Sequence, residues 1–219
     1  MPDEKPHSRE GVVKSRIESL SDGIFAFAMT LMVISLAVPQ IPVAEAPALL
    51  PGILAGMYNQ FIVFVIAFFV ISSYWVSHHQ ILGSVQFVND AIIRINILFL
   101  FFIVLIPFTT ATSGDYTNVF AAVILFHFNL LIASLLLTLL WVYITRHHAE
   151  LNPGGRKIVE SRQRKEKGLV IPGVTLLAIG VSFIDTSLSM SCYLLIPVLL
   201  LILKFRPGRE KNLSPAEEW

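Results

Sequence analysis

Six apolar runs divide this sequence, and they constrain its fold more than any other feature. They cover residues 16–38, 53–77, 90–112, 118–144, 169–186 and 188–204. About 20 helical residues cross a hydrocarbon core of roughly 30 Å. Charged residues make up 14 % of the chain, against roughly 25 % in an average soluble domain. The sequence therefore predicts an all-α membrane protein with six transmembrane helices.

The distribution of lysine and arginine predicts how these runs are oriented. Lysine and arginine lie before or at the start of the first run, in alternate connections or at their edges, and at the end of the sixth run or after it. The other three connections contain Glu45, Asp115 and Asp185 but no lysine or arginine. Since positive residues stay on the cytoplasmic side, both termini are expected in the cytoplasm. We therefore expect a cytoplasmic segment 1–13, a transmembrane domain 14–205 and a cytoplasmic tail 206–219.

The first run combines a polar beginning with an apolar remainder. Arg16, Ser21 and Asp22 precede Gly23, after which apolar side chains dominate. A carboxylate at membrane depth is costly unless it is paired, so Asp22 needs a partner. Arg16, or a histidine from another helix, is the candidate that the sequence offers.

One face of the same run carries a stripe of bulky side chains. Phe27, then Thr30 or Leu31, then Ile34 recur at spacings of three and four, and Gly23 extends the stripe toward the cytoplasm. If several copies of the helix surround an axis, the stripe forms stacked rings that exclude water where they are narrow. Alternatively, the stripe simply packs against neighbouring helices.

Three segments of the chain resemble the transmembrane protein 175 family, which comprises lysosomal potassium channels and their prokaryotic relatives. The segment from Arg16 to Gly23, RIESLSDG, resembles the family's Arg-x-x-x-Phe-Ser-Asp signature, with Leu20 in place of phenylalanine. The segment YWVSHH, residues 74–79, is similar to its second-helix motif. Residues 90–96 and 106–109 resemble its third helix, and the likeness extends over roughly residues 14–205.

This resemblance implies a potassium-permeable cation channel without a re-entrant pore loop. The sequence contains no TVGYG-like filter. Prokaryotic members carry one six-helix repeat, as this chain does, and assemble as tetramers around the first helix. A homotetramer in the plasma membrane of a prokaryote, in contact with membrane lipids, is thus implied. Phe27 occupies the position of the family's tightest hydrophobic ring, where isoleucine or leucine is usual, and Thr30, Leu31 and Ile34 are expected to line the pore beyond it.

The resemblance also assigns a supporting role to the polar residues. We expect a buried hydrogen-bonded network that holds the first helix at its angle. Its expected members are Arg16, Ser21, Asp22, Gly23, Trp75, His78 and Asn96.

Two other classes of function remain open from the residues alone. A proton-coupled secondary transporter would use Asp22, His78 and His127, although His127 and Asn129 are also suited to interhelical hydrogen bonding. A membrane enzyme would need a nucleophile motif, which the sequence lacks, so no catalytic residue is assigned. Adjacent histidines on a helix point in different directions, so no metal site is expected. No cofactor and no nucleic-acid partner is expected either.

Overall fold

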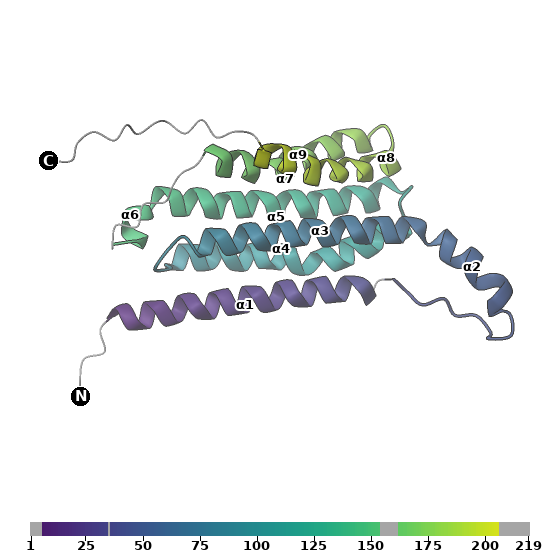
Figure 1. Ribbon diagram of the computed structural model, residues 1–219, viewed down its shortest axis with the longest axis horizontal. Coiled ribbons are helices and arrows are strands. Elements are labelled where there is room, and N and C mark those ends of the chain that lie inside the picture. The colour runs from purple at the N-terminus through teal and green to yellow at the C-terminus, as the bar shows by residue number, and fades with distance from the viewer. Residues whose placement is uncertain (1–5, 35, 154–161, 206–219) are drawn as a thin grey trace.

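The computed structural model describes residues 6–34, 36–153 and 162–205, and these form helices and their connections (Figure 1). The helices are α1 (Pro6–Ile34), α2 (Ala46–Gly56), α3 (Tyr58–Leu82), α4 (Asp90–Asp115), α5 (Phe120–Arg146), α6 (His148–Leu151), α7 (Arg162–Ser182), α8 (Thr186–Ser191), the 3-10 helix η1 (Cys192–Leu194) and α9 (Leu195–Phe205). No strand occurs among the described residues. The predicted all-α fold is confirmed.

Five helical stretches are long and apolar enough to cross a membrane. They are Val13–Ile34, Tyr58–Leu82, Asp90–Asp115, Phe120–Arg146 and Thr186–Leu203. The predicted fifth run corresponds to Gly168–Ser182, a shorter apolar part of α7. The chain is a multi-pass membrane protein, and the sixth crossing stays a prediction.

The second predicted run is displaced in the structure. Hydropathy placed it at 53–77, whereas the spanning helix α3 covers Tyr58–Leu82. Residues 46–56 form the separate helix α2, and Met57 is its C-cap. Gly56, Asn59 and Gln60 lie around this break, but hydropathy averaged over the whole run does not locate it. The sixth predicted run is also interrupted, because η1 separates α8 from α9.

The ends of two helices are fixed by side-chain caps. The side chain of Asn89 accepts a hydrogen bond from the backbone N–H of Ile92 at 3.1 Å, which begins α4. Asp185 accepts from the N–H of Leu188 at 2.8 Å, which begins α8. These caps satisfy N–H groups that lack a partner within the helix.

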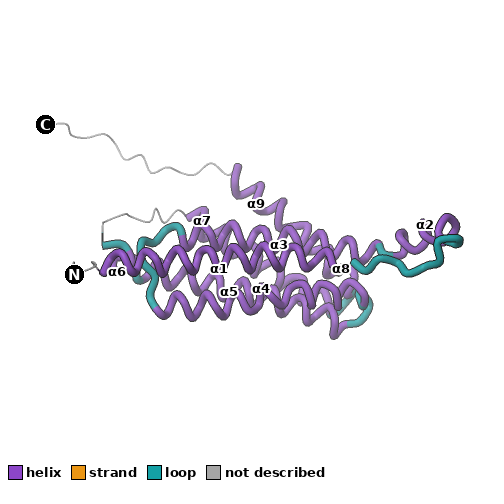
Figure 2. The backbone as a smooth tube through the Cα atoms, turned by 90° about the horizontal axis from the view of Figure 1, so that it is seen from below, coloured by secondary structure: helices purple, strands orange, loops and turns teal. Residues whose placement is uncertain are grey.

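The helix α1 lies at the edge of the bundle, where it packs on α4 and α3 (Figures 1 and 2). The pair α4 and α5 forms the centre, and α7 covers α5 on the side away from α1. The buried apolar side chains come from all of these helices and form one core.

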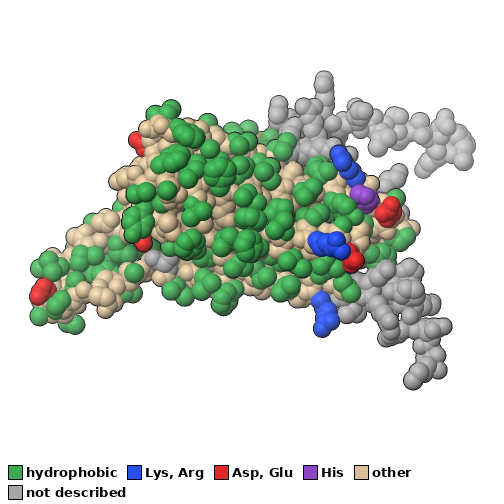
Figure 3. Space-filling model, turned by 180° about the vertical axis from the view of Figure 1, so that it is seen from behind, with side chains coloured by type: hydrophobic (Ala, Val, Ile, Leu, Met, Phe, Trp, Pro, Cys, Tyr) green, Lys and Arg blue, Asp and Glu red, His purple; other side chains and the backbone are tan. Residues whose placement is uncertain are grey.

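The two ends of the bundle differ in charge. At the end where α1 begins, which we call the basic end, lie the lysine and arginine side chains that the structure describes (Figure 3). They are Lys14, Arg16, Arg94 and Arg146. The opposite end carries Glu45, Asp115 and Asp185. On the face that Figure 3 shows, apolar side chains are spread over the surface between the two ends, as expected for a surface in contact with lipid.

Candidate functional site

The helix α1 has one face turned into the bundle. Ser21, Phe25, Ala28 and Met32 are all buried, at spacings of four, three and four. This spacing keeps them on one side of a helix, where they contact α3 and α4. We call these four residues the inward stripe.

The opposite face of α1 is exposed, although most of its side chains are apolar. Phe27 is 65 % exposed and Ile34 is 71 % exposed. Gly23 and Thr30 lie on the same face and are exposed, while Leu31 beside them is partly buried. These residues, the outward face, include the side chains that the sequence predicted to line a pore. The hydroxyl of Thr30 donates to the carbonyl oxygen of Phe27 at 2.9 Å.

A groove runs between α1 and α4 beside this face. Its volume is about 380 Å³. Its lining is mainly apolar and consists of Ser19, Leu20, Gly23, Ile24, Phe27, Ala28, Leu31 and Val104. Leu20, which replaces the phenylalanine of the family signature, lines this groove and is exposed in the isolated chain.

A buried chain of hydrogen bonds joins α1, α3 and α4 near the basic end. His78 Nε2 lies 2.6 Å from Asn96 Oδ1. The amide Nδ2 of Asn96 donates to Ser21 Oγ at 3.1 Å. Because the Asn96 amide nitrogen donates to Ser21, the Asn96 atom that faces His78 is the amide oxygen, which can only accept. His78 Nε2 must therefore carry a hydrogen. All three side chains are buried, so the chain of bonds satisfies groups that water does not reach.

Aromatic rings surround this histidine. The ring of Phe99 stacks on His78 with a centroid separation of 5.5 Å and an interplanar angle of 16°. The ring of Phe25 lies 5.7 Å from the same imidazole, centroid to centroid, at an interplanar angle of 50°. These contacts fix the orientation of the imidazole that the hydrogen bond requires.

A separate hydrogen bond joins α1 directly to α3 at the surface. Trp75 Nε1 donates to Asp22 Oδ1 at 2.9 Å. The indole of Trp75 also stacks on His79, with centroids 5.8 Å apart. Asp22 is exposed in the single chain, which differs from the buried position expected for it.

Arg16 does not join these contacts. It is exposed, and among the described residues it has no ion-pair partner. The partner of Asp22 is therefore Trp75, and neither of the partners that the sequence suggested, an arginine or a histidine, bonds to it. Gly23 takes no part in the hydrogen bonds and lies on the outward face, where an added Cβ would meet nothing within 4 Å.

His127 belongs to a different cluster. Its Nδ1 lies 2.8 Å from the hydroxyl of Tyr193, and its Nε2 lies 3.0 Å from Ser189 Oγ. Asn129 instead donates to Thr109 Oγ1 at 3.2 Å. His127 thus ties α5 to α8 and η1, and Asn129 ties α5 to α4. Within the described ranges, no group of three or more His, Cys, Asp or Glu side chains is placed to hold a metal ion.

Sequence reasoning did not single out Lys14 or Asn152, which make polar contacts at the basic end. Lys14 lies seven residues before Ser21, so the inward stripe extends to it. This spacing was the available signal. Asn152 follows the short helix α6 and had no comparable pattern.

The spanning helices and the buried polar side chains between them define a class, the multi-pass helical membrane proteins. Comparisons place the chain more narrowly. A family model described as "Endosomal/lysosomal potassium channel TMEM175" matches residues 16–107. A potassium channel of Chamaesiphon minutus is 31 % identical over 196 residues, which cover 82 % of this chain and 90 % of the relative.

One further relative and one solved structure agree with these matches. A potassium channel of Streptomyces collinus is 28 % identical over 186 residues, or 81 % of this chain and 86 % of the relative. The crystal structure of a lysosomal potassium-selective channel TMEM175 homolog from Chamaesiphon minutus superimposes with a TM-score of 0.71. It is 28 % identical, and the match covers 88 % of this chain and 98 % of that chain. The chain belongs to the TMEM175 family.

Proposed function

We propose that this protein is a potassium-permeable channel, not an enzyme, and that four copies surround a pore lined by the outward face of α1. Its family and the names of its relatives support potassium as the permeant ion. By the positive-inside rule, the basic end faces the cytoplasm. The potassium channels that the chain resembles come from prokaryotes, which supports a prokaryotic plasma membrane as its location.

The observation that carries this proposal is the exposure of the outward face of α1. Phe27 and Ile34 project away from the chain's own core. The inward stripe already supplies the packing that holds α1 on α3 and α4. The outward face is therefore available to meet its symmetry-related copies around an axis.

Phe27 would form the constriction of this pore, and Thr30 would lie one turn beyond it. Four bulky apolar side chains around an axis exclude water and so form a barrier that ions must cross partly dehydrated. The Thr30 hydrogen is used by the Phe27 carbonyl. The lone pairs of the Thr30 oxygen are then free to replace part of the hydration shell of a cation. Potassium loses water more readily than sodium, which favours potassium.

The hydrogen bonds near the basic end would support this pore by fixing α1. Ser21, which belongs to the inward stripe, accepts a hydrogen bond from Asn96. Asp22, the next residue, accepts one from Trp75. Two adjacent residues of α1 are thus held by two different helices. Such an arrangement restricts both rotation and tilt of α1, which decide what the outward face presents to the axis.

The hydrogen bonds give less support to a proton-coupled transporter. His78 bonds to Asn96 between α3 and α4, whereas His127 bonds to Tyr193 and Ser189 on the other side of α5. Asp22 bonds to Trp75 at the surface. The three side chains that this mechanism would need thus belong to separate groups of contacts.

The proposal is tested by recording from the purified protein in planar bilayers. We expect ohmic cation currents that are larger for potassium than for sodium, and native mass spectrometry should give the mass of four chains. Saturable flux without single-channel events would contradict the channel assignment and favour a transporter.

The role of Phe27 is tested by Phe27→Ala. Removing the ring should widen the constriction, so we expect a larger conductance and a weaker preference for potassium. Phe69→Ala is the matched control, because Phe69 on α3 is the same residue type and is also 65 % exposed. Equal effects of the two substitutions, or no effect of Phe27→Ala, would remove the outward face of α1 from the pore.

A further inference from the structure

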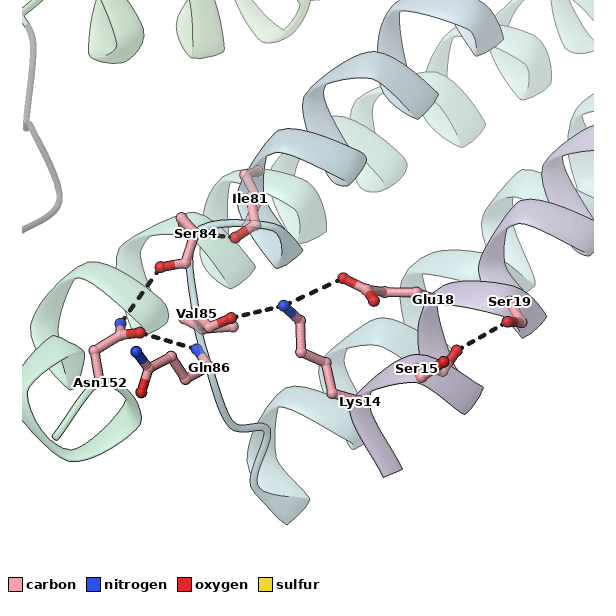
Figure 4. Close-up of polar contacts among 9 residues, drawn as sticks. All are labelled: Lys14, Ser15, Glu18, Ser19, Ile81, Ser84, Val85, Gln86 and Asn152. Carbon is pink, nitrogen blue, oxygen red and sulfur yellow. Dashed lines mark hydrogen bonds and ion pairs between the residues drawn. The ribbon is translucent and has the colours of Figure 1, made fainter. Parts of the chain in front are cut away.

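Polar contacts at the basic end join α1 to the α3–α4 loop (Figure 4). The ammonium group of Lys14 donates to the carbonyl oxygen of Val85 at 2.7 Å. It also lies 3.5 Å from a carboxylate oxygen of Glu18, one turn further along α1. Lys14 is only partly exposed, and Val85 is buried. A charged donor makes this hydrogen bond stronger than one between neutral groups.

The other side of the same loop is held by the end of α6. The backbone N–H groups of Gln86 and Phe87 both donate to the carbonyl oxygen of Leu151 at 3.2 Å. The N–H of Gln86 also lies 2.9 Å from the side-chain oxygen of Asn152. The amide of Asn152 reaches the carbonyl of Ser84 at 3.4 Å. In Figure 4 the loop passes between Lys14 on one side and Asn152 on the other.

These contacts form a continuous connection from α6 to α1. Val85 accepts from α1, and its neighbours Gln86 and Phe87 donate to the segment 148–152. Leu151 and Asn152 are buried, so water does not compete for these bonds. Phe27 lies 13 residues after Lys14, or about 20 Å along a helix. A tilt at the beginning of α1 therefore displaces the outward face.

We propose that Lys14 is a positioning residue for α1, and that the loop 83–89 transmits displacements of the segment 148–152 to it. The effect on currents rests on the proposed function, because it requires α1 to line the pore. The connection itself does not, since it concerns hydrogen bonds within one chain. A displacement at the cytoplasmic ends of α5 and α6 thus changes the orientation of α1.

The connection is tested by hydrogen exchange on the full-length protein in lipid vesicles. Lys14→Gln removes the charged donor, and Asn152→Ala removes the side-chain contact on the other side of the loop. Each should raise amide exchange about two- to tenfold in peptides 83–89, as expected for the loss of one such bond. Lys14→Gln should also raise exchange in 148–152, and Asn152→Ala should raise it at the beginning of α1. Lys14→Arg, which retains a charged donor, should restore most of the protection.

Arg94→Gln is the matched control for loss of positive charge, because Arg94 is exposed at the same end of the bundle. It should leave exchange in all three segments unchanged. If Lys14→Gln affects only peptides 83–89, the loop does not transmit, and the connection is refuted whether or not the protein conducts.

Currents test the positioning role separately. In bilayers, Lys14→Gln and Asn152→Ala should change the open probability in the same direction, with Lys14→Arg close to the original protein. The double variant should change it less than the two single effects combined. Coupled exchange with an unaltered open probability would refute the positioning role, while the absence of any potassium current in the original protein would refute the proposed function instead.

Discussion

Replacing Asn96 by leucine tests whether the buried hydrogen bonds hold α1 on the bundle. Asn96 bonds to both neighbours in the chain from His78 to Ser21. Leucine has the branched shape of asparagine but no polar atom, so Asn96→Leu removes both bonds and leaves no cavity. Its methyl groups need more room than the amide does, so the polar contribution is obtained by comparison with a second asparagine-to-leucine substitution.

The expected loss in the free energy of unfolding depends on whether each former partner of Asn96 can form another hydrogen bond. The buried His78 Nε2–H loses its acceptor, and an unpaired buried donor costs about 1–3 kcal/mol. Ser21 Oγ loses only a donor, and its own hydroxyl hydrogen can still donate to a carbonyl of its helix, as Ser72 does to Phe68 at 2.8 Å. Its loss is therefore close to the average interhelical bond in a membrane protein, about 0.6 kcal/mol. Together these give a loss of about 2–4 kcal/mol in the free energy of unfolding.

The assay is reversible unfolding in mixed detergent micelles, with Asn129→Leu as the matched control. Asn129 is also a buried asparagine, but it makes one bond, to Thr109, and its Oδ1 has no hydrogen-bond partner among the described residues. Its replacement should cost about 1 kcal/mol or less. If Asn96→Leu costs no more than Asn129→Leu, the bonds to Ser21 and His78 do not stabilise the position of α1.

Two further substitutions test the packing away from α1. In Gly114→Ala the new Cβ would lie 3.3 Å from the Cα of Gln60, so thermal unfolding should show a loss of about 1 kcal/mol. Gly173→Ala, with nothing within 4 Å, should instead gain up to about 1 kcal/mol from helix propensity. His127→Leu should cost about 1–3 kcal/mol by removing the hydrogen-bond partner that the buried hydroxyl of Tyr193 has on α5. Adding Tyr193→Phe should recover part of that loss, and a purely additive result would contradict the hydrogen-bond account.

Hydropathy was sufficient to predict the helical fold because a chain in lipid must satisfy its own backbone groups. It was less successful at boundaries inside apolar sequence. Asn59 and Gln60 follow the break at Met57, and Ser191 precedes the short helix Cys192–Leu194, but hydropathy averaged over a run does not distinguish them from polar residues inside a helix. Such breaks depend on packing against other helices, which a one-dimensional pattern does not contain.

The residues of the candidate site were likewise predicted only in part from the sequence. Resemblance to a family placed Ser21, His78 and Asn96 in one group, and the structure brings them within hydrogen-bonding distance. Arg16 was expected in the same group, but among the described residues it has no ion-pair partner. Lys14 escaped attention because its partner is a backbone carbonyl, and any residue type can provide that. Its spacing of seven residues from Ser21 indicates the face of α1 on which it lies, but not this partner.

The central claim is that the outward face of α1 surrounds the ion path, and cysteine substitution tests it most directly. Cys192 is the one cysteine in the sequence, so Cys192→Ala gives a thiol-free background. In that background, four Phe27→Cys side chains around an axis should bind Cd²⁺ together and block potassium current reversibly. Phe69→Cys on α3 should leave the current unchanged. Potassium current that persists in saturating Cd²⁺ with Phe27→Cys, as it does with Phe69→Cys, would contradict the account.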